Sequence, residues 1–110
     1  MTVIIVDDDA GFRRAARELL EGCGLTIVAE AGDAAEARAA CAAHRPAGVL
    51  LDVNLPGTSG HALARELRAA HPPLRILLTS TDPTIGGEAG VAEFVPKIDL
   101  ATFDLATYFA

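Results

Sequence analysis

Acidic side chains follow two of the most hydrophobic segments of this chain. Three aspartates, at positions 7–9, come directly after the run Val3-Ile4-Ile5-Val6, and Asp52 comes directly after Gly48-Val49-Leu50-Leu51. Carboxylates that gather in one place repel each other and cost folding free energy unless a cation neutralises them. Their positions at the ends of two buried segments therefore predict a site for a hard divalent cation, which prefers oxygen ligands.

A lone lysine and a threonine end two further apolar segments. Lys97 is the only lysine among nine basic residues, and it follows Phe94-Val95-Pro96, while Thr79 follows the run at 74–78. A carboxylate can attack a phosphoryl group, a facing cation can neutralise the transferred oxygens, and a hydroxyl can add a hydrogen bond. For this chemistry the candidate metal ligands are Asp7 and Asp8, and the candidate nucleophile is Asp52. Thr79 would supply the hydroxyl and Lys97 the cation.

Predicted strands and helices alternate along the chain. Short apolar runs predict strands at residues 3–6, 25–29, 49–51, 74–78 and 92–95. Apolar residues at helical spacing predict helices at residues 12–20, 33–44, 59–70 and 99–109. Such alternation implies a parallel sheet with helices on both faces, and ligands bind beyond the carboxyl ends of its strands. The five candidate residues all follow strand ends, so we expect them to meet at one edge of the sheet.

The connection between Thr79 and Val91 differs from the others. It is close to the minimum length for a parallel crossover, and it contains three glycines and one proline. We expect at most one helical turn there, started by Asp82-Pro83 and broken at Gly86-Gly87.

Four motifs, in order over nearly the whole chain, resemble the receiver domain of bacterial two-component response regulators. They are Val6-Asp7-Asp8-Asp9, Leu51-Asp52-Val53-Asn54-Leu55-Pro56-Gly57-Thr58-Ser59-Gly60, Leu77-Leu78-Thr79-Ser80 and Phe94-Val95-Pro96-Lys97. The resemblance implies one receiver domain over residues 1–110 with an α/β, flavodoxin-like (CheY-like) doubly wound fold. We expect a five-stranded parallel sheet in the order 2-1-3-4-5, with the fourth helix shortened or absent.

The resemblance also implies a role for each acidic residue. Asp52 matches the phosphoacceptor, and Asp8 matches a direct Mg²⁺ ligand. Asp7 matches an acid that binds the metal mainly through water, and Asn54 would offer its backbone carbonyl oxygen. The expected metal ligands are therefore Asp7, Asp8, Asp52 and Asn54. Asp9, by contrast, is expected to cap the following helix.

Three further positions match the switch and phosphate-binding residues of the family. Thr79 matches the hydroxyl that moves towards the phosphoryl group, and Lys97 matches the lysine that pairs with phosphate. Phe94 occupies the aromatic switch position, although a core role is an equal alternative for an aromatic residue in a strand. The family often places a cis proline after its lysine, whereas Ile98 follows here.

These roles imply a signalling domain. A histidine kinase or phosphotransfer protein would phosphorylate Asp52 in a Mg²⁺-dependent reaction, which would switch the output surface towards a downstream effector domain or protein. Such a domain is not an enzyme beyond assisting its own phosphorylation and dephosphorylation. The alternative is a receiver-like interaction module that works without phosphorylation. A phosphatase with an aspartyl intermediate fits less well, because Gly11 stands where its Asp-x-Asp-x-Thr motif requires threonine.

Composition narrows the class of protein further. The net charge of −6 argues against direct nucleic-acid binding, and the apolar runs are far shorter than the roughly 18 residues that a membrane helix needs. No signal peptide is recognisable, so we expect a cytoplasmic protein that does not bind membranes, with Cys23 and Cys41 as free thiols. The sequence is compatible with a monomer or a homodimer, and with a stand-alone receiver or one that is followed by an effector domain.

Overall fold

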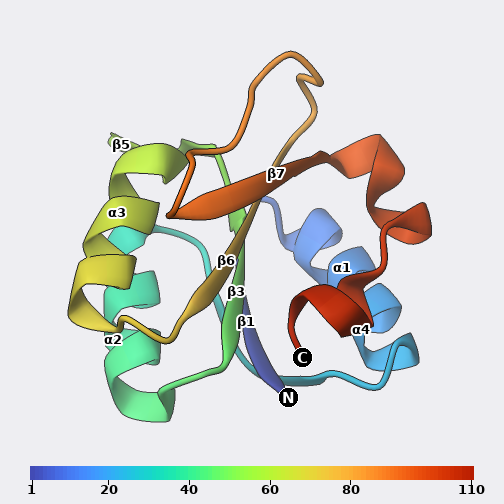
Figure 1. Cartoon of the computed structure of the whole chain (residues 1–110), viewed down its shortest axis with the longest axis horizontal. Coiled ribbons are helices and arrows are strands. Elements are labelled where there is room, and N and C mark those ends of the chain that lie inside the picture. The colour runs from blue at the N-terminus through green and yellow to red at the C-terminus, as the bar shows by residue number, and fades with distance from the viewer.

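A parallel sheet runs through the middle of the molecule (Figure 1). The computed structural model describes residues 1–110. The strands lie in the spatial order β2-β1-β3-β6-β7, and each neighbouring pair is parallel. Counted along the chain this is the order 2-1-3-4-5, which confirms the predicted topology. The strands span Thr2–Val6 (β1), Thr26–Ala31 (β2), Gly48–Asp52 (β3), Arg75–Ser80 (β6) and Ala92–Pro96 (β7).

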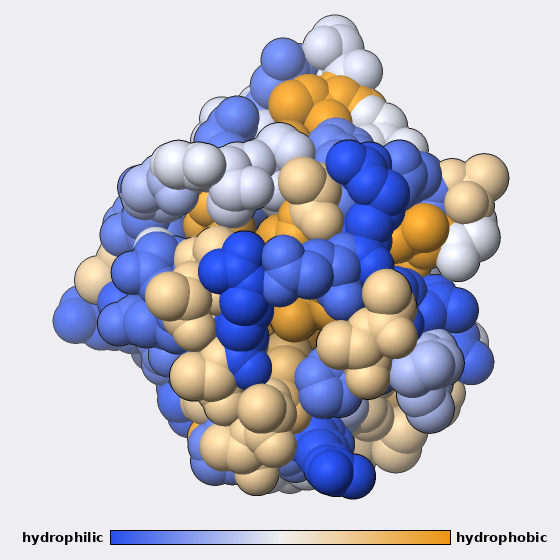
Figure 2. Space-filling view, turned by 90° about the vertical axis from the view of Figure 1, so that its left-hand side faces the viewer, coloured by the Kyte–Doolittle hydropathy of each residue, from blue (hydrophilic) through white to orange (hydrophobic).

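Helices cover both faces of this sheet. The helices α2 (Ala34–His44) and α3 (Gly60–Ala70) lie on the left in Figure 1, and α1 (Ala10–Gly22) and the short α4 (Leu105–Tyr108) lie on the right. Successive side chains of a strand point to opposite faces. Leu51 and Leu78 accordingly belong to the hydrophobic cluster under α2 and α3, whereas Leu50 and Leu77 belong to the cluster under α1 and α4. The outer side of α2 and α3 is largely hydrophilic, with weakly hydrophobic residues scattered in it (Figure 2).

Side-chain caps set the start of the three long helices. Asp9 accepts hydrogen bonds from the backbone N–H groups of Gly11 and Phe12 at the start of α1, as predicted. Asp33 and Ser59 cap α2 and α3 in the same way. These bonds satisfy N–H groups that have no partner inside the helix. The helices α1 and α2 therefore begin within a few residues of the ends of β1 and β2, which keeps this part of the carboxyl edge of the sheet compact.

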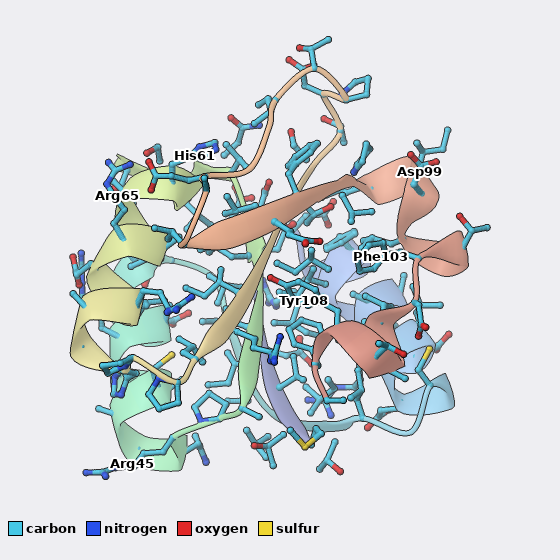
Figure 3. The ribbon with its side chains drawn as sticks, viewed as in Figure 1. Arg45, His61, Arg65, Asp99, Phe103 and Tyr108 are labelled. Carbon is cyan, nitrogen blue, oxygen red and sulfur yellow. The ribbon has the colours of Figure 1, made fainter.

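The segment between β6 and β7 contains no helix. It extends above the strand ends and returns beside α3 (Figure 1), with a turn in which the Asp82 carboxylate accepts hydrogen bonds from Thr84. The fourth helix of the predicted pattern is therefore absent. Side chains of α3 hold this segment instead, because Arg65 pairs with Glu88 at 2.7 Å and a ring nitrogen of His61 lies 2.8 Å from the Gly86 carbonyl oxygen. Figure 3 shows His61 and Arg65 at the upper end of α3.

The prediction of one closing helix over residues 99–109 is wrong. The chain forms a 3₁₀ helix at Lys97–Thr102 (η1), an extended Phe103, and then α4. Asp104 accepts a hydrogen bond from the backbone N–H of Thr107, so the second helix starts with a new cap. Phe103 packs on the α1 side of the sheet near Tyr108, with ring centroids 5.9 Å apart (Figure 3). Packing of these two half-buried rings, together with the new cap at Asp104, interrupts the continuous helix that the spacing suggests.

Two smaller features complete the fold. A hairpin of two-residue strands, β4 (Asn54–Leu55) and β5 (Thr58–Ser59), connects β3 to α3 and was not predicted. Both cysteines are free thiols, as expected, with Cys23 exposed and Cys41 buried.

Candidate functional site

The carboxyl ends of four strands meet at one edge of the sheet. Asp52 at the end of β3 lies opposite Thr79 of β6 in the strand register. Thr79 lies opposite Val95 of β7, two residues before Lys97. The acidic residues that follow β1 reach the same edge from the other side of β3, which pairs with both β1 and β6. The sheet order therefore brings together residues that are up to 90 positions apart in sequence.

Asp7, Asp8 and Asp52 form a cluster of carboxylates. One oxygen of each lies within 4.8 Å of the others. Asp7 is 1% exposed and Asp52 is 6% exposed, whereas Asp8 is exposed to solvent. Two buried acids with a third at the rim form a set of oxygen donors that fits a hard divalent cation entering from solvent. Asp9 lies outside the cluster because its carboxylate caps α1.

Lys97 is the cation that faces this cluster. Its Nζ donates a hydrogen bond to Asp7 Oδ2 at 2.8 Å, and it lies 3.8 Å from Asp52 Oδ2. The same Nζ lies 4.0 Å from the centroid of the Phe12 ring. One ammonium against three carboxylates leaves an excess of negative charge, so the site retains a capacity to bind a further cation.

The environment of Asp52 disfavours its charged form. Burial of the carboxyl, together with the nearby charge of Asp7, raises the pKa of Asp52 to about 6. The backbone N–H of Asn54, which donates to Asp52 Oδ1 at 3.2 Å, and the Lys97 ammonium oppose this increase. At neutral pH the carboxylate is therefore charged in most molecules, but it is held at a cost in folding free energy.

Two buried hydroxyl groups lie at the end of β6, the strand that pairs with β3 at Asp52. Thr79 is fully buried, and its Oγ1 has no hydrogen-bond partner. The neighbouring Ser80 hydroxyl is also buried, but it accepts hydrogen bonds from the Asn54 side-chain amide at 3.3 Å and from the Asp82 backbone at 3.1 Å. Buried polar atoms are nearly always paired, so the isolated Thr79 hydroxyl is available for an acceptor that enters the site.

The remaining predicted residue, Phe94, lies opposite Leu78 on the edge strand β7. Its ring is half-buried and packs against the cluster under α2 and α3. It is therefore neither a fully enclosed core residue nor a free surface residue.

The contact of Phe12 with Lys97 was not predicted. Helical spacing identified it only as an apolar position of α1, and no local signal in the sequence joins it to a lysine 85 positions later.

Comparison with known proteins assigns the chain to a family. Residues 3–100 match the response regulator receiver domain. The chain belongs to this family. It is therefore a receiver domain of the two-component type, which confirms the resemblance found in the sequence motifs.

Individual relatives agree with this assignment. The chain is 41% identical over 110 residues to the DNA-binding transcriptional activator DevR/DosR of Mycobacterium tuberculosis, a match that covers 94% of the chain and 50% of the relative. The curated relatives are longer proteins, of which the chain spans about a fifth to a half.

Solved structures of receiver domains share the fold. The signal receiver domain of the putative response regulator NarL from Mycobacterium tuberculosis is 30% identical, with a TM-score of 0.79 over 97% of this chain and 94% of that one. The response regulator TrrA of Thermotoga maritima, solved in complex with Mg²⁺-BeF, is 28% identical, with a TM-score of 0.69 over 74% of this chain and 70% of that one.

None of the helices has the length and apolar character needed to cross a bilayer.

Proposed function

We propose that residues 1–110 act as a phosphoacceptor domain in which Asp52 receives a phosphoryl group. The donor would be a phosphohistidine of a histidine kinase or phosphotransfer protein. One observation carries the proposal: a buried carboxylate faces the only lysine of the chain beside a buried threonine hydroxyl that has no partner. Family membership and the Mg²⁺-BeF complex of TrrA support it.

The acidic cluster would hold Mg²⁺. Asp7, Asp8 and Asp52 offer carboxylate oxygens, and Asn54 would offer its backbone carbonyl. When bound, the ion neutralises charge on the phosphoryl oxygens and on the attacking carboxylate. The excess negative charge of the cluster and its oxygen-only donor set are the features of this chain that favour such an ion.

Each neighbouring residue has a task in the transfer. A carboxylate oxygen of Asp52 attacks the phosphorus, a new O–P bond forms, and the P–N bond of the donor breaks with its electron pair going to the imidazole. Asp52 must be ionised to attack, and with a pKa of about 6 it is mostly ionised near pH 7.5. The Asn54 N–H orients one Asp52 oxygen, while Lys97 stands 3.8 Å from the other and pairs with the phosphoryl oxygens after transfer.

The phosphoryl group would then supply the acceptor that Thr79 lacks. Movement of Thr79 Oγ1 towards it would disturb the packing at the carboxyl end of β6, where the preceding residue, Leu78, lies opposite Phe94 in the strand register. A change of the Phe94 rotamer would convert the chemical event into an altered surface for a downstream effector domain or protein. In this account the domain shifts between two populated states, and it assists only its own phosphorylation and dephosphorylation.

The alternative, an interaction module that works without phosphate, is favoured by the missing fourth helix. The intact site speaks against it, because a module without phosphate chemistry has no need to hold two acids in a buried cluster at a cost in stability. A phosphorylation experiment distinguishes the phosphoacceptor domain from the interaction module.

The test is phosphorylation by acetyl phosphate with Mg²⁺, followed by mass spectrometry of the intact protein. We expect the native chain to gain one phosphoryl group and Asp52→Asn to gain none. Asp9→Asn is the matched control, because it makes the same chemical change at a neighbouring acid that only caps α1, a task that asparagine also performs. Equal phosphorylation of Asp52→Asn, or no phosphorylation and no beryllofluoride binding by the native chain, would refute the proposal.

A further inference from the structure

The backbone around Lys97 does little to direct its side chain. Lys97 begins the 3₁₀ helix η1, and the next residue, Ile98, is 87% exposed and therefore packs against almost nothing. A lysine side chain has four rotatable bonds and loses much conformational entropy when it is held in one place. Some other group must therefore fix the ammonium where it can face Asp52.

Phe12 is a contact of Lys97 that comes from a firmly held element. The ring lies in the first turn of α1, where the Asp9 carboxylate caps the N–H groups of Gly11 and of Phe12 itself. The ring also packs against the hydrophobic cluster under α1, so it is anchored on its inner side. Its centroid lies 4.0 Å from Lys97 Nζ, which is within the range of a cation–π interaction.

The aromatic ring differs from the other two partners of Lys97 in one respect. Asp7 and Asp52, at 2.8 and 3.8 Å, both take part in the proposed metal binding and phosphoryl transfer. A bound cation would offset the negative charges of both carboxylates, and a transferred phosphoryl group would change Asp52 chemically. The ring carries no charge and takes part in neither event, so it can hold the ammonium in every state of the site.

We propose that Phe12 is a positioning residue that holds the Lys97 ammonium over the acidic cluster through the face of its ring. The inference deepens the proposed function and rests on it for its effect on phosphorylation, but the contact itself can be tested without metal or phosphate. Replacing the ring with an aliphatic side chain is expected to slow phosphorylation about three- to tenfold, the range that corresponds to a half-buried cation–π contact.

The first test uses the fact that Lys97 is the only lysine in the chain. Selective ¹³C labelling of lysine yields a single ε-methylene signal in an NMR spectrum of the metal-free protein. The ring current of Phe12 is expected to move this signal upfield. Phe12→Leu should abolish the shift, and Phe12→Tyr, which keeps the ring, should restore it. Phe12→Met serves in the same way if Phe12→Leu does not fold.

Phe103→Leu is the matched control for loss of an aromatic side chain. Phe103 is also half-buried and packs on the same cluster, but its ring partner is Tyr108. This variant should leave both the lysine signal and the phosphorylation rate unchanged. An unshifted signal in the native protein, or a shift that survives the loss of the ring, would overturn the inference.

The second test measures the rate of phosphorylation by acetyl phosphate for the same variants. We expect a slower reaction for Phe12→Leu and a native rate for Phe12→Tyr. Equal rates for the native chain and Phe12→Leu would overturn the positioning role while leaving the phosphoacceptor function intact. If the native chain accepts no phosphoryl group, the proposed function fails, and the NMR measurement alone decides whether Phe12 positions Lys97.

Discussion

Replacing Asp52 with asparagine should make the metal-free protein more stable at neutral pH. Asparagine has nearly the same shape, and its Oδ1 can still accept the hydrogen bond from the Asn54 N–H. The substitution removes the negative charge of a residue that is only 6% exposed and lies beside Asp7. Removing a charge that the fold disfavours stabilises the fold, even though it is expected to abolish phosphorylation.

The size of the effect follows from the pKa of Asp52. The ordinary value is 3.8, and burial raises it to about 6 in the folded protein. Since one pKa unit corresponds to ~1.4 kcal/mol, the charged form costs the folded state on the order of 3 kcal/mol. Relaxation of the site will reduce this, so we expect a gain of ~1–3 kcal/mol at pH 7.5 and a rise in Tm of roughly 4–13 °C.

The dependence on pH gives the prediction its sign. Below the ordinary pKa of 3.8 the carboxyl is protonated in both states, and it contributes no penalty. Between this value and about 6 the unfolded chain loses its proton while the folded chain keeps it, so stability falls as pH rises. Above about 6 the penalty is constant. The variant should therefore match the native chain below pH 4 and exceed it at pH 7.5.

The assay is urea unfolding followed by circular dichroism at pH 3.5 and pH 7.5, with EDTA to remove divalent ions. The slope m should be equal for both proteins, so that the midpoints report stability alone. Asp9→Asn should change stability by no more than ~0.5 kcal/mol, because asparagine keeps the cap. A variant that is less stable at pH 7.5, or equally stabilised at both pH values, would refute the reasoning.

Two further predictions concern the metal and the approach of α3 to β3. Mg²⁺ at a hundredfold excess over its Kd should stabilise the native protein by ~2.7 kcal/mol in thermal unfolding. Asp8→Asn should reduce this stabilisation without unfolding the domain, because Asp8 is exposed. If the stabilisation by Mg²⁺ is undiminished in this variant, Asp8 is not a ligand of the metal. Gly60→Ala should destabilise the protein by ~1–3 kcal/mol in urea, because an added Cβ would lie 2.5 Å from the Asp52 carbonyl oxygen, whereas Gly86→Ala meets open space and should have little effect.

Much of the fold could be predicted because its signals are local. Apolar runs such as residues 3–6 indicate strands, and a capping residue such as Asp33 or Ser59 marks the start of a helix through hydrogen bonds within a few residues. The alternation of strands and helices then leaves few sheet topologies, and each puts the carboxyl ends of the strands at one edge.

The closing helix, whose prediction failed, and the anchor of the β6–β7 segment, which was not predicted, both depend on packing that the local pattern does not reveal. Residues 99–109 have helical spacing, but the helix breaks at Phe103, whose half-buried ring packs beside Tyr108 on the α1 side of the sheet. The segment between β6 and β7 had no predicted anchor, yet Arg65 of α3 holds it through Glu88. Spacing along the chain carries no information about such partners.

For the site, the amino-acid sequence alone determined which chemical groups are present and that they end neighbouring strands: the acids at 7, 8 and 52, the hydroxyl at 79 and the ammonium at 97. Only the tertiary structure decided how these groups are paired. The contact of Lys97 with Asp7 and the ring of Phe12, and the lack of any partner for Thr79, depend on the register of β3, β6 and β7 and on the packing of α1. Local patterns specify elements, whereas distances of a few ångströms between them are set by how the whole core packs.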